Sequence, residues 1–254
     1  MAEQIITGQR EAGSGRAHSL TQTGPFHLTL DLARLQAGLV ATSTAVIIIG
    51  ILAQLYLTFF GFDTPVRRLR PFNLDEELSL PTWYASFLFL TCSALLSVIA
   101  ITARRHAQAH VLHWMFLALV FVGLSMEEVV GLHELWGRFM RANFVLPPTL
   151  RHAGVIPLFA VAVILAAAYW RFVWALPNRA RLFFILSGAM VVSGAVLMEL
   201  VGSYLFVEHG QFTSIAGAST TFEEILEISG VTLFAWALID YIKVNFKTVS
   251  LHLS

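Results

Sequence analysis

The stretch SMEEVVGLHELWG, residues 125–137, carries the side chains best suited to chemistry in this chain. Its ionisable groups are the carboxylates of Glu127, Glu128 and Glu134 and the imidazole of His133, and it continues the apolar run FLALVFVGL. Carboxylates and imidazoles bind divalent metal ions, and they also take up and release protons. A charged side chain at the centre of a membrane helix costs about 2.5–3.5 kcal/mol, so such positions usually serve a function. The stretch is therefore a candidate site inside a membrane protein.

Two later segments carry carboxylates of the same kind. Glu199 lies within the apolar sequence VLMELVG, and three further glutamates occupy the segment FEEILE. In a helix, residues three and four apart lie on one face, so these last three carboxylates form an acidic stripe. We predict one shared metal site with the following candidate ligands: Glu127, Glu128, His133, Glu134, Glu199, Glu223, Glu224 and Glu227.

The composition indicates a membrane protein. Hydrophobic residues make up 57% of the 254 and charged residues 13%, whereas soluble domains carry about a quarter charged residues. The mean hydropathy is +0.72. The net charge is zero, so nothing indicates a nucleic-acid partner, and the single cysteine, Cys92, excludes a disulfide within the chain and a thiolate metal cage. We predict an all-α integral membrane helix bundle that contacts the lipid bilayer.

Six apolar segments are long enough to cross a membrane. They cover residues 37–60, 82–103, 112–135, 153–176, 182–207 and 219–245. The predicted organisation is a polar N-terminal arm, residues 1–32, followed by a six-helix transmembrane domain, residues 33–254. If the third segment is one helix, Glu127 and Glu134 lie seven residues apart on the same face.

The basic residues predict the orientation of the chain. Ten Lys and Arg residues lie on the side of the membrane that holds both termini, and six lie on the other side. The more basic side faces the cytoplasm, so we expect a multi-pass protein of the inner (plasma) membrane with both termini cytoplasmic. The candidate acids of the third, fifth and sixth segments then come to one depth, in the outer half of the membrane.

Each acid also has an ordinary structural explanation. Thr220-x-x-Glu223 and Thr221-x-x-Glu224 both fit a capping box, in which a carboxylate serves the start of a helix. His133 and Glu134 could be exposed at a helix end, and Glu199 could pair with a single neighbour. These alternatives stay open at the level of the sequence.

Three short motifs resemble those of a group of uncharacterised bacterial multi-spanning membrane proteins. The motifs are an acidic segment followed by PTWYAS, then S-x-E-E-x-x-x-x-H-E, then E-E-x-x-E-x-x-G, and the resemblance covers about residues 70–240. The resemblance implies that seven residues belong to one motif set: Glu128, His133, Glu134, Glu199, Glu223, Glu224 and Glu227. It implies no activity, because the group has none established.

The residue types favour one function over two alternatives. Carboxylates crowded in one pocket cannot all ionise without a compensating cation, and this ligand set suits Mn, Fe, Zn, Ca or Mg. We therefore predict an outward-facing metal site, which could belong to a metal-dependent membrane enzyme. The Glu-x-x-His motif of di-metal bundles is missing. The alternatives are a non-catalytic protein that docks against partner subunits of a membrane complex, and ion or proton translocation.

Overall fold

The structure, a computed structural model, describes most of the chain, and helices are the only regular secondary structure among the described residues. These are residues 31–60, 69, 71–74, 76, 78–145, 154–209 and 214–246. The predicted N-terminal arm falls outside them except for its last two residues. The predicted all-α bundle is confirmed.

Six helices are long and apolar enough to cross a membrane. Five crossings are regular helices: α1 (Leu32–Phe60), α2 (Leu80–Arg105), α3 (Val111–Val130), α5 (Val155–Ala175) and α8 (Ser214–Asn245). The fifth crossing in chain order is composite, with α6 (Asn178–Val192), the π-helical turn η3 (Ser193–Met198) and α7 (Glu199–His209). The predicted number of crossings agrees with the structure, and the chain is a multi-pass membrane protein.

The third predicted segment is wrong at its C-terminal end. α3 stops at Val130, and Gly131 adopts a left-handed conformation with φ 62° and ψ 48°. The Gly131 N–H donates to the carbonyl of Glu127 at 2.8 Å, which closes the last turn of α3. A new helix, α4 (Leu132–Asn143), then begins. Glycine adopts this conformation without steric cost and commonly ends helices. The expectation that Glu127 and Glu134 share one helix face is therefore incorrect.

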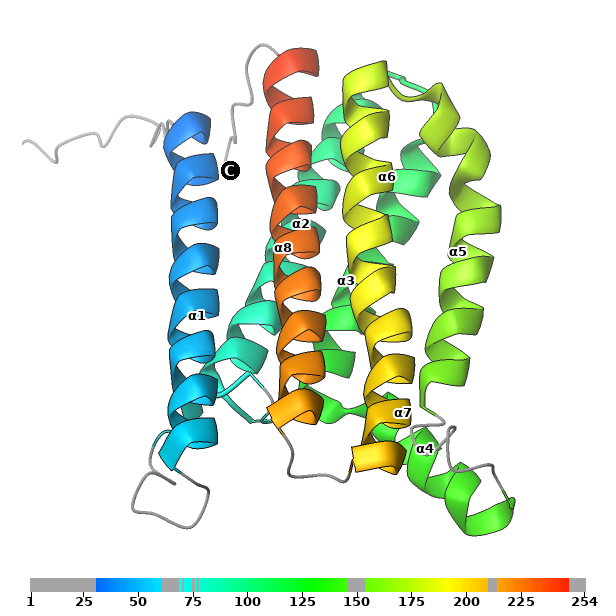
Figure 1. Cartoon of the computed structure of the whole chain (residues 1–254). Coiled ribbons are helices and arrows are strands. Elements are labelled where there is room, and N and C mark those ends of the chain that lie inside the picture. The colour runs from blue at the N-terminus through cyan, green and yellow to red at the C-terminus, as the bar shows by residue number, and fades with distance from the viewer. Residues whose placement is uncertain are drawn as a thin grey trace, which may run out of the picture. The chain divides into compact units, whose positions relative to one another are not determined.

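α4 is an amphipathic helix rather than part of a crossing. Its exposed apolar side chains include Leu135, Trp136 and Phe139, whereas Arg138 and Arg141 are charged. Helices with one apolar and one charged face typically lie along the membrane interface. Figure 1 shows α4 at one end of the bundle, beside the N-terminal end of α5.

α8 is the central helix of the bundle. It packs against α1, α2, α6, η3 and α7, as Figure 1 shows for its neighbours α1 and α6. Four of its side chains are completely inaccessible: Ile228, Ala235, Leu238 and Ile239. Because α8 also carries the acidic stripe of the sixth segment, its central position brings those carboxylates against several other helices.

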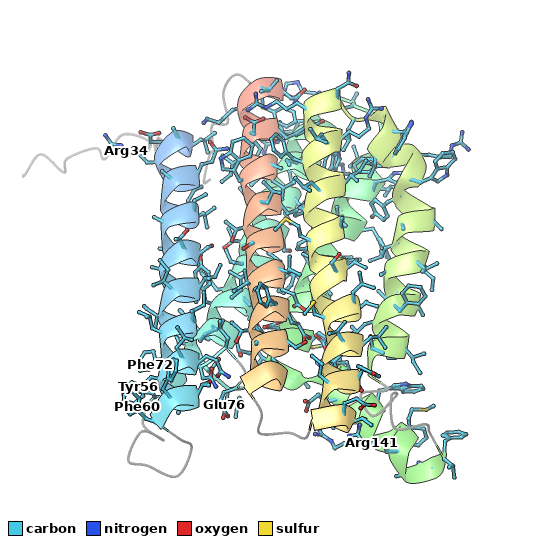
Figure 2. All side chains as sticks on the ribbon, in the orientation of Figure 1. Arg34, Tyr56, Phe60, Phe72, Glu76 and Arg141 are labelled. Carbon is cyan, nitrogen blue, oxygen red and sulfur yellow. The ribbon has the colours of Figure 1, made fainter. Side chains whose placement is uncertain are left out.

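The two ends of the bundle differ in the residues they gather. α1 and α6 begin, and α8 ends, at the same end (Figure 1). Figure 2 shows Arg34 at this end, and Glu76 and Arg141 at the opposite end. The end of α3, the end of α7 and the start of α8 all lie at that opposite end, which therefore holds the candidate acids.

Candidate carboxylate and histidine site

Glu127 and His133 form the best-defined contact of the site. The Oε1 atom of Glu127 accepts a short hydrogen bond from the Nδ1 atom of His133. The same oxygen accepts the backbone N–H of His133 at 3.3 Å. That N–H lies in the first turn of α4, where backbone donors have no partner within the helix. Glu127 therefore both orients the imidazole and satisfies the start of α4.

The left-handed turn at Gly131 makes this contact possible. In one continuous helix, positions six apart point about 120° away from each other. The change of chain direction at Gly131 instead places the imidazole against Glu127 in the last turn of α3. Both side chains are partly buried, with His133 31% and Glu127 20% exposed.

His133 carries a positive charge more readily than a free histidine. Burial by itself would lower its pKa, but the hydrogen bond to Glu127 and the negative charges of Glu127, Glu199 and Glu134 raise the pKa above its ordinary value of 6.5. The same interactions show that Glu199 of the fifth crossing lies within electrostatic range of His133. The site thus joins α3, α4 and α7.

Glu227 connects α8 to the same site. It interacts electrostatically with Glu224 and Glu223 on its own helix, and with Glu128 and Glu127 on α3. The charged groups that act most strongly on Glu227 are all carboxylates. Glu227 of α8 therefore lies within electrostatic range of two carboxylates of α3.

Glu227 also lies directly against the π-helical turn of the fifth crossing. A Cβ atom added to Gly194 would lie 2.6 Å from Cγ of Glu227 and 2.9 Å from the backbone oxygen of Glu223. Small residues permit such close approach between membrane helices. η3 ends immediately before Glu199, and π-helical turns within α-helices are frequent at functional sites.

Three buried polar side chains near this end of the bundle were not predicted from the sequence. Oε1 of Gln54, Oγ of Ser203 and Oγ of Ser219 are inaccessible and have no hydrogen-bond partner among the described residues. Ser203 follows Glu199 by one helical turn on α7, and Ser219 precedes Glu223 by one turn on α8. The spacing of four residues from a glutamate was the sequence signal for the two serines, and Gln54 had no such signal. Buried oxygen atoms normally have a partner, such as an ordered water or an ion.

The remaining candidate, Glu134, is engaged at the surface. Its Oε2 atom accepts a hydrogen bond from Nη1 of Arg138 at 3.2 Å, within α4. Glu134 acts on His133 through its charge, but it belongs to the exposed edge of the site. Glu134 and His133 both lie in the first turn of α4, but neither is fully exposed there, so the alternative of simple exposure at a helix end does not describe them.

The capping-box explanation for Glu223 and Glu224 is wrong. α8 begins at Ser214, so Thr220 and Thr221 lie inside the helix. Thr221 donates its hydroxyl hydrogen to the carbonyl of Gly217 at 2.7 Å instead of capping a terminus. The two glutamates therefore belong to the body of the helix.

The described side chains do not form a ready-made metal centre. No group of three His, Cys, Asp or Glu residues in the described part of the chain has an arrangement that could hold a metal ion. The divalent ion and its eight candidate ligands therefore stay predictions.

Comparison with known proteins gives a family without an assigned activity. A family model described as a domain of unknown function, DUF8692, matches residues 39–241. This range contains all eight candidate ligands. No curated protein and no solved structure matches the chain. Since the match covers most of the chain, this protein belongs to the DUF8692 family.

Proposed function

We propose that this protein binds a divalent cation at the outer end of its bundle, among the carboxylates of α3, α7 and α8. The observation that carries the proposal is the position of Glu227 on α8, which packs closely against Gly194 of η3 and lies within electrostatic range of Glu128 and Glu127 on α3. Neighbouring carboxylates repel each other and cannot all ionise without a compensating positive charge. A bound cation would supply that charge while leaving the carboxylates ionised.

The Glu127–His133 contact supports a metal ligand role for the imidazole. Metal-binding histidines usually donate their second ring N–H to a carboxylate or a carbonyl, which fixes the ring. In this protein Nδ1 of His133 donates to Glu127, and this leaves Nε2 for the ion. Glu127 would then orient the ligand rather than bind the ion itself.

The buried hydroxyls supply a further argument. Oγ of Ser203 and Oγ of Ser219 have no hydrogen-bond partner among the described residues. Hard cations take oxygen ligands, either directly or through bound water. Ion binding would draw Glu128, Glu199 and Glu227 closer together than they lie in the structure. An imidazole among the ligands favours Mn, Fe or Zn over Ca or Mg.

The distribution of basic residues supports an outward-facing site. The end of the bundle that holds the start of α1 and the end of α8 carries the larger number of Lys and Arg residues, and this end is expected to be cytoplasmic. A catalytic role would add an open coordination position and an activated water. We propose that the protein binds the ion, and we propose no reaction.

Proton uptake is a second candidate, and the Glu127–His133 contact favours it as well. A protonated His133 would itself be the positive charge among the carboxylates, and its pKa is raised. Chains of intramembrane carboxylates and histidines commonly carry protons. The two candidates make opposite demands on His133, because a metal ion needs the neutral imidazole.

Elemental analysis of protein purified in detergent without chelators tests the proposal. The wild type should contain close to one equivalent of a divalent metal, and Glu227→Gln should contain much less. Glu208→Gln is the matched control, because Glu208 is an exposed glutamate at the end of α7, and it should retain the metal. A wild type that is free of metal, and that takes up none when Mn²⁺, Zn²⁺ or Fe²⁺ is added, would refute the proposal.

A further inference from the structure

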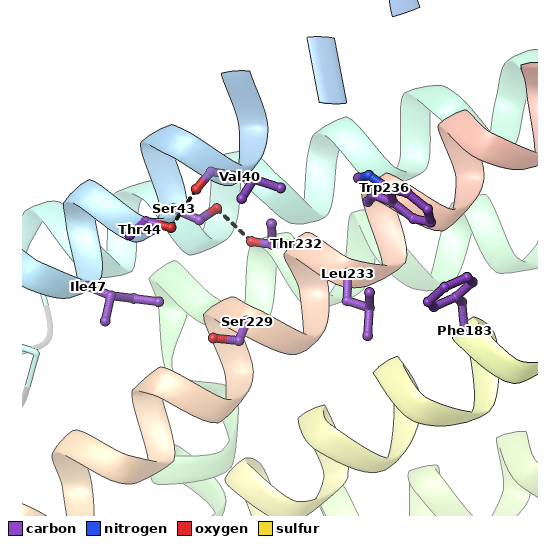
Figure 3. A pocket seen from close by; sticks show the side chains of 9 residues that line it. All are labelled: Val40, Ser43, Thr44, Ile47, Phe183, Ser229, Thr232, Leu233 and Trp236. Carbon is purple, nitrogen blue, oxygen red and sulfur yellow. Dashed lines mark hydrogen bonds between the residues drawn. The ribbon is translucent and has the colours of Figure 1, made fainter. Parts of the chain in front are cut away.

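We infer that the groove between α1 and α6 binds one anionic phospholipid, with an acyl chain along the groove and the phosphate at its polar end. The groove has a volume of about 430 Å³, which falls in the range of about 300–1,000 Å³ typical of small-molecule sites. α1 and α6 both pack against α8, so α8 forms the floor. Figure 3 shows the groove with Val40 and Ile47 on α1 and Phe183 on α6.

The wall of the groove suits an apolar occupant. Three of the hydroxyl groups that line it, beside that of Ser229, are already paired within the protein: Ser43 with Thr232 at 2.6 Å, and Thr44 with the carbonyl of Val40 at 2.8 Å (Figure 3). Thr232 also donates to the carbonyl of Ile228 at 2.6 Å. Where a further helix packs against such a surface, Ser and Thr hydroxyls commonly form hydrogen bonds with it. Here these hydroxyls are satisfied internally, which favours a hydrocarbon chain over a partner helix.

An aromatic pair closes the groove near the start of α6. The rings of Phe183 and Trp236 lie 5.1 Å apart in an edge-to-face arrangement. The guanidinium of Arg179 lies over the Trp236 ring, 5.8 Å from its centroid. Aromatic and basic residues of this kind gather where the hydrocarbon region meets the headgroups.

A polar cluster lies one helical turn beyond this aromatic pair. Gln36 precedes Val40 by four residues, Arg179 precedes Phe183 by four, and Asp240 follows Trp236 by four. α1 and α6 begin at this end of the bundle and α8 ends there (Figure 1). Each of these three polar residues therefore lies one turn closer to this end than its partner in the groove. The fourth member of the cluster, Lys243, lies in the last turn of α8.

The polar cluster has a net positive charge. Arg179 and Asp240 neutralise each other through two hydrogen bonds, of 2.8 Å and 3.2 Å. Lys243 donates to the uncharged Oε1 of Gln36 at 2.8 Å, and Gln36 donates to the carbonyl of Trp236 at 3.0 Å. Buried Gln36 thus holds the ammonium group at the mouth of the groove without neutralising it. The negative charge of a phosphate would complement the ammonium group of Lys243. The groove begins one helical turn away from this group.

Native mass spectrometry of delipidated protein tests this inference with two probes, phosphatidylglycerol and phosphatidylcholine. We expect one phosphatidylglycerol to bind per chain in preference to phosphatidylcholine. Val40→Phe, which fills the groove, should lose the bound lipid. Val161→Phe is the matched control, because Val161 on α5 is exposed to nearly the same degree (47% against 45%). The control should bind as the wild type does.

The headgroup contact has its own pair of variants. Lys243→Gln should reduce the preference for phosphatidylglycerol about fivefold, the effect of one basic side chain near an anionic headgroup. Arg104→Gln removes the same charge from the last turn of α2 at the same end, and it should leave the preference unchanged. Equal losses in the two charge variants, or in the two valine variants, would overturn the inference. So would a wild-type dimer that Val40→Phe converts to a monomer without changing lipid binding, because the groove would then be an interface between copies.

Discussion

Glu227 on α8 packs against Gly194 in the π-helical turn of the fifth crossing, so closely that a Cβ atom at position 194 would lie 2.6 Å from its Cγ. This contact fixes where the acidic stripe of α8 meets the rest of the site. Because Glu227 also interacts with Glu128 and Glu127 of α3, it is the side chain at which the acidic stripe meets both the third and the fifth crossings.

Gly194→Ala should destabilise the protein and weaken ion binding. Overpacking of this kind costs about 1–3 kcal/mol, because the new methyl group would meet both Glu227 and the backbone oxygen of Glu223. Thermal unfolding in detergent measures the loss. Gly188→Ala is the control, since no atom lies within 4 Å of a Cβ at that position. Equal stability of the two variants would contradict the packing described here.

Gly131→Ala should cost about 1–2 kcal/mol, the penalty of a left-handed conformation for a residue with a Cβ atom. Gly131→Asn should cost less, because asparagine tolerates this conformation better. Gly123→Ala, in an open position of α3, should cost nothing. Thermal unfolding compares the three variants. If Gly131→Ala is as stable as Gly123→Ala, the helix break between α3 and α4 is not as the structure has it.

The Glu127–His133 contact predicts a stability that falls as the pH rises. The pKa of His133 is raised above its ordinary value of 6.5 in the folded state. A group with a raised folded pKa contributes stability that is complete below the unfolded pKa and is lost as the pH rises through the folded pKa. In the presence of chelator, wild type should therefore exceed His133→Gln in stability at acidic pH, and the difference should shrink above pH 6.5. A difference that grows with pH would contradict the contact.

A chelator should lower the unfolding temperature of the wild type at neutral pH. Free metal at a hundred times its dissociation constant stabilises the folded state by about 2.7 kcal/mol. The double variant His133→Ala with Glu199→Ala should not respond, because it lacks two proposed ligands. Metal affinity should fall on acidification, since protons compete for the same groups. If wild type and double variant are equally unaffected by chelator, the acids serve packing or proton binding instead.

The orientation proposed from the basic residues can be measured directly. A reporter fused after residue 247 should be cytoplasmic, and a reporter inserted between α7 and α8, within residues 210–213, should be outside. An alkaline phosphatase fusion active only outside the membrane, and a fluorescent protein active only inside, give opposite readings at each position. An exported C-terminus would place the carboxylate site on the cytoplasmic side.

The sequence alone determined the membrane class, the number of crossings and the end of the bundle that holds the acids. These features depend on composition and on the length of apolar segments, because a bilayer of fixed thickness accepts only helices of a certain length. Alternating crossings then bring the end of α3 and the start of α8 to the same depth. These three features can be predicted without knowing how the helices pack against one another.

Only the tertiary structure decided which of these acids meet. A continuous third helix would have placed Glu127 beside Glu134, but the left-handed Gly131 placed it against His133 instead. The start of α8 at Ser214 removed the capping role of Glu223, and the close approach at Gly194 brought Glu227 against the fifth crossing. The physical reason is that a single backbone torsion, or one missing Cβ atom, redirects a side chain by several ångströms. Periodicity along one helix carries no information on either.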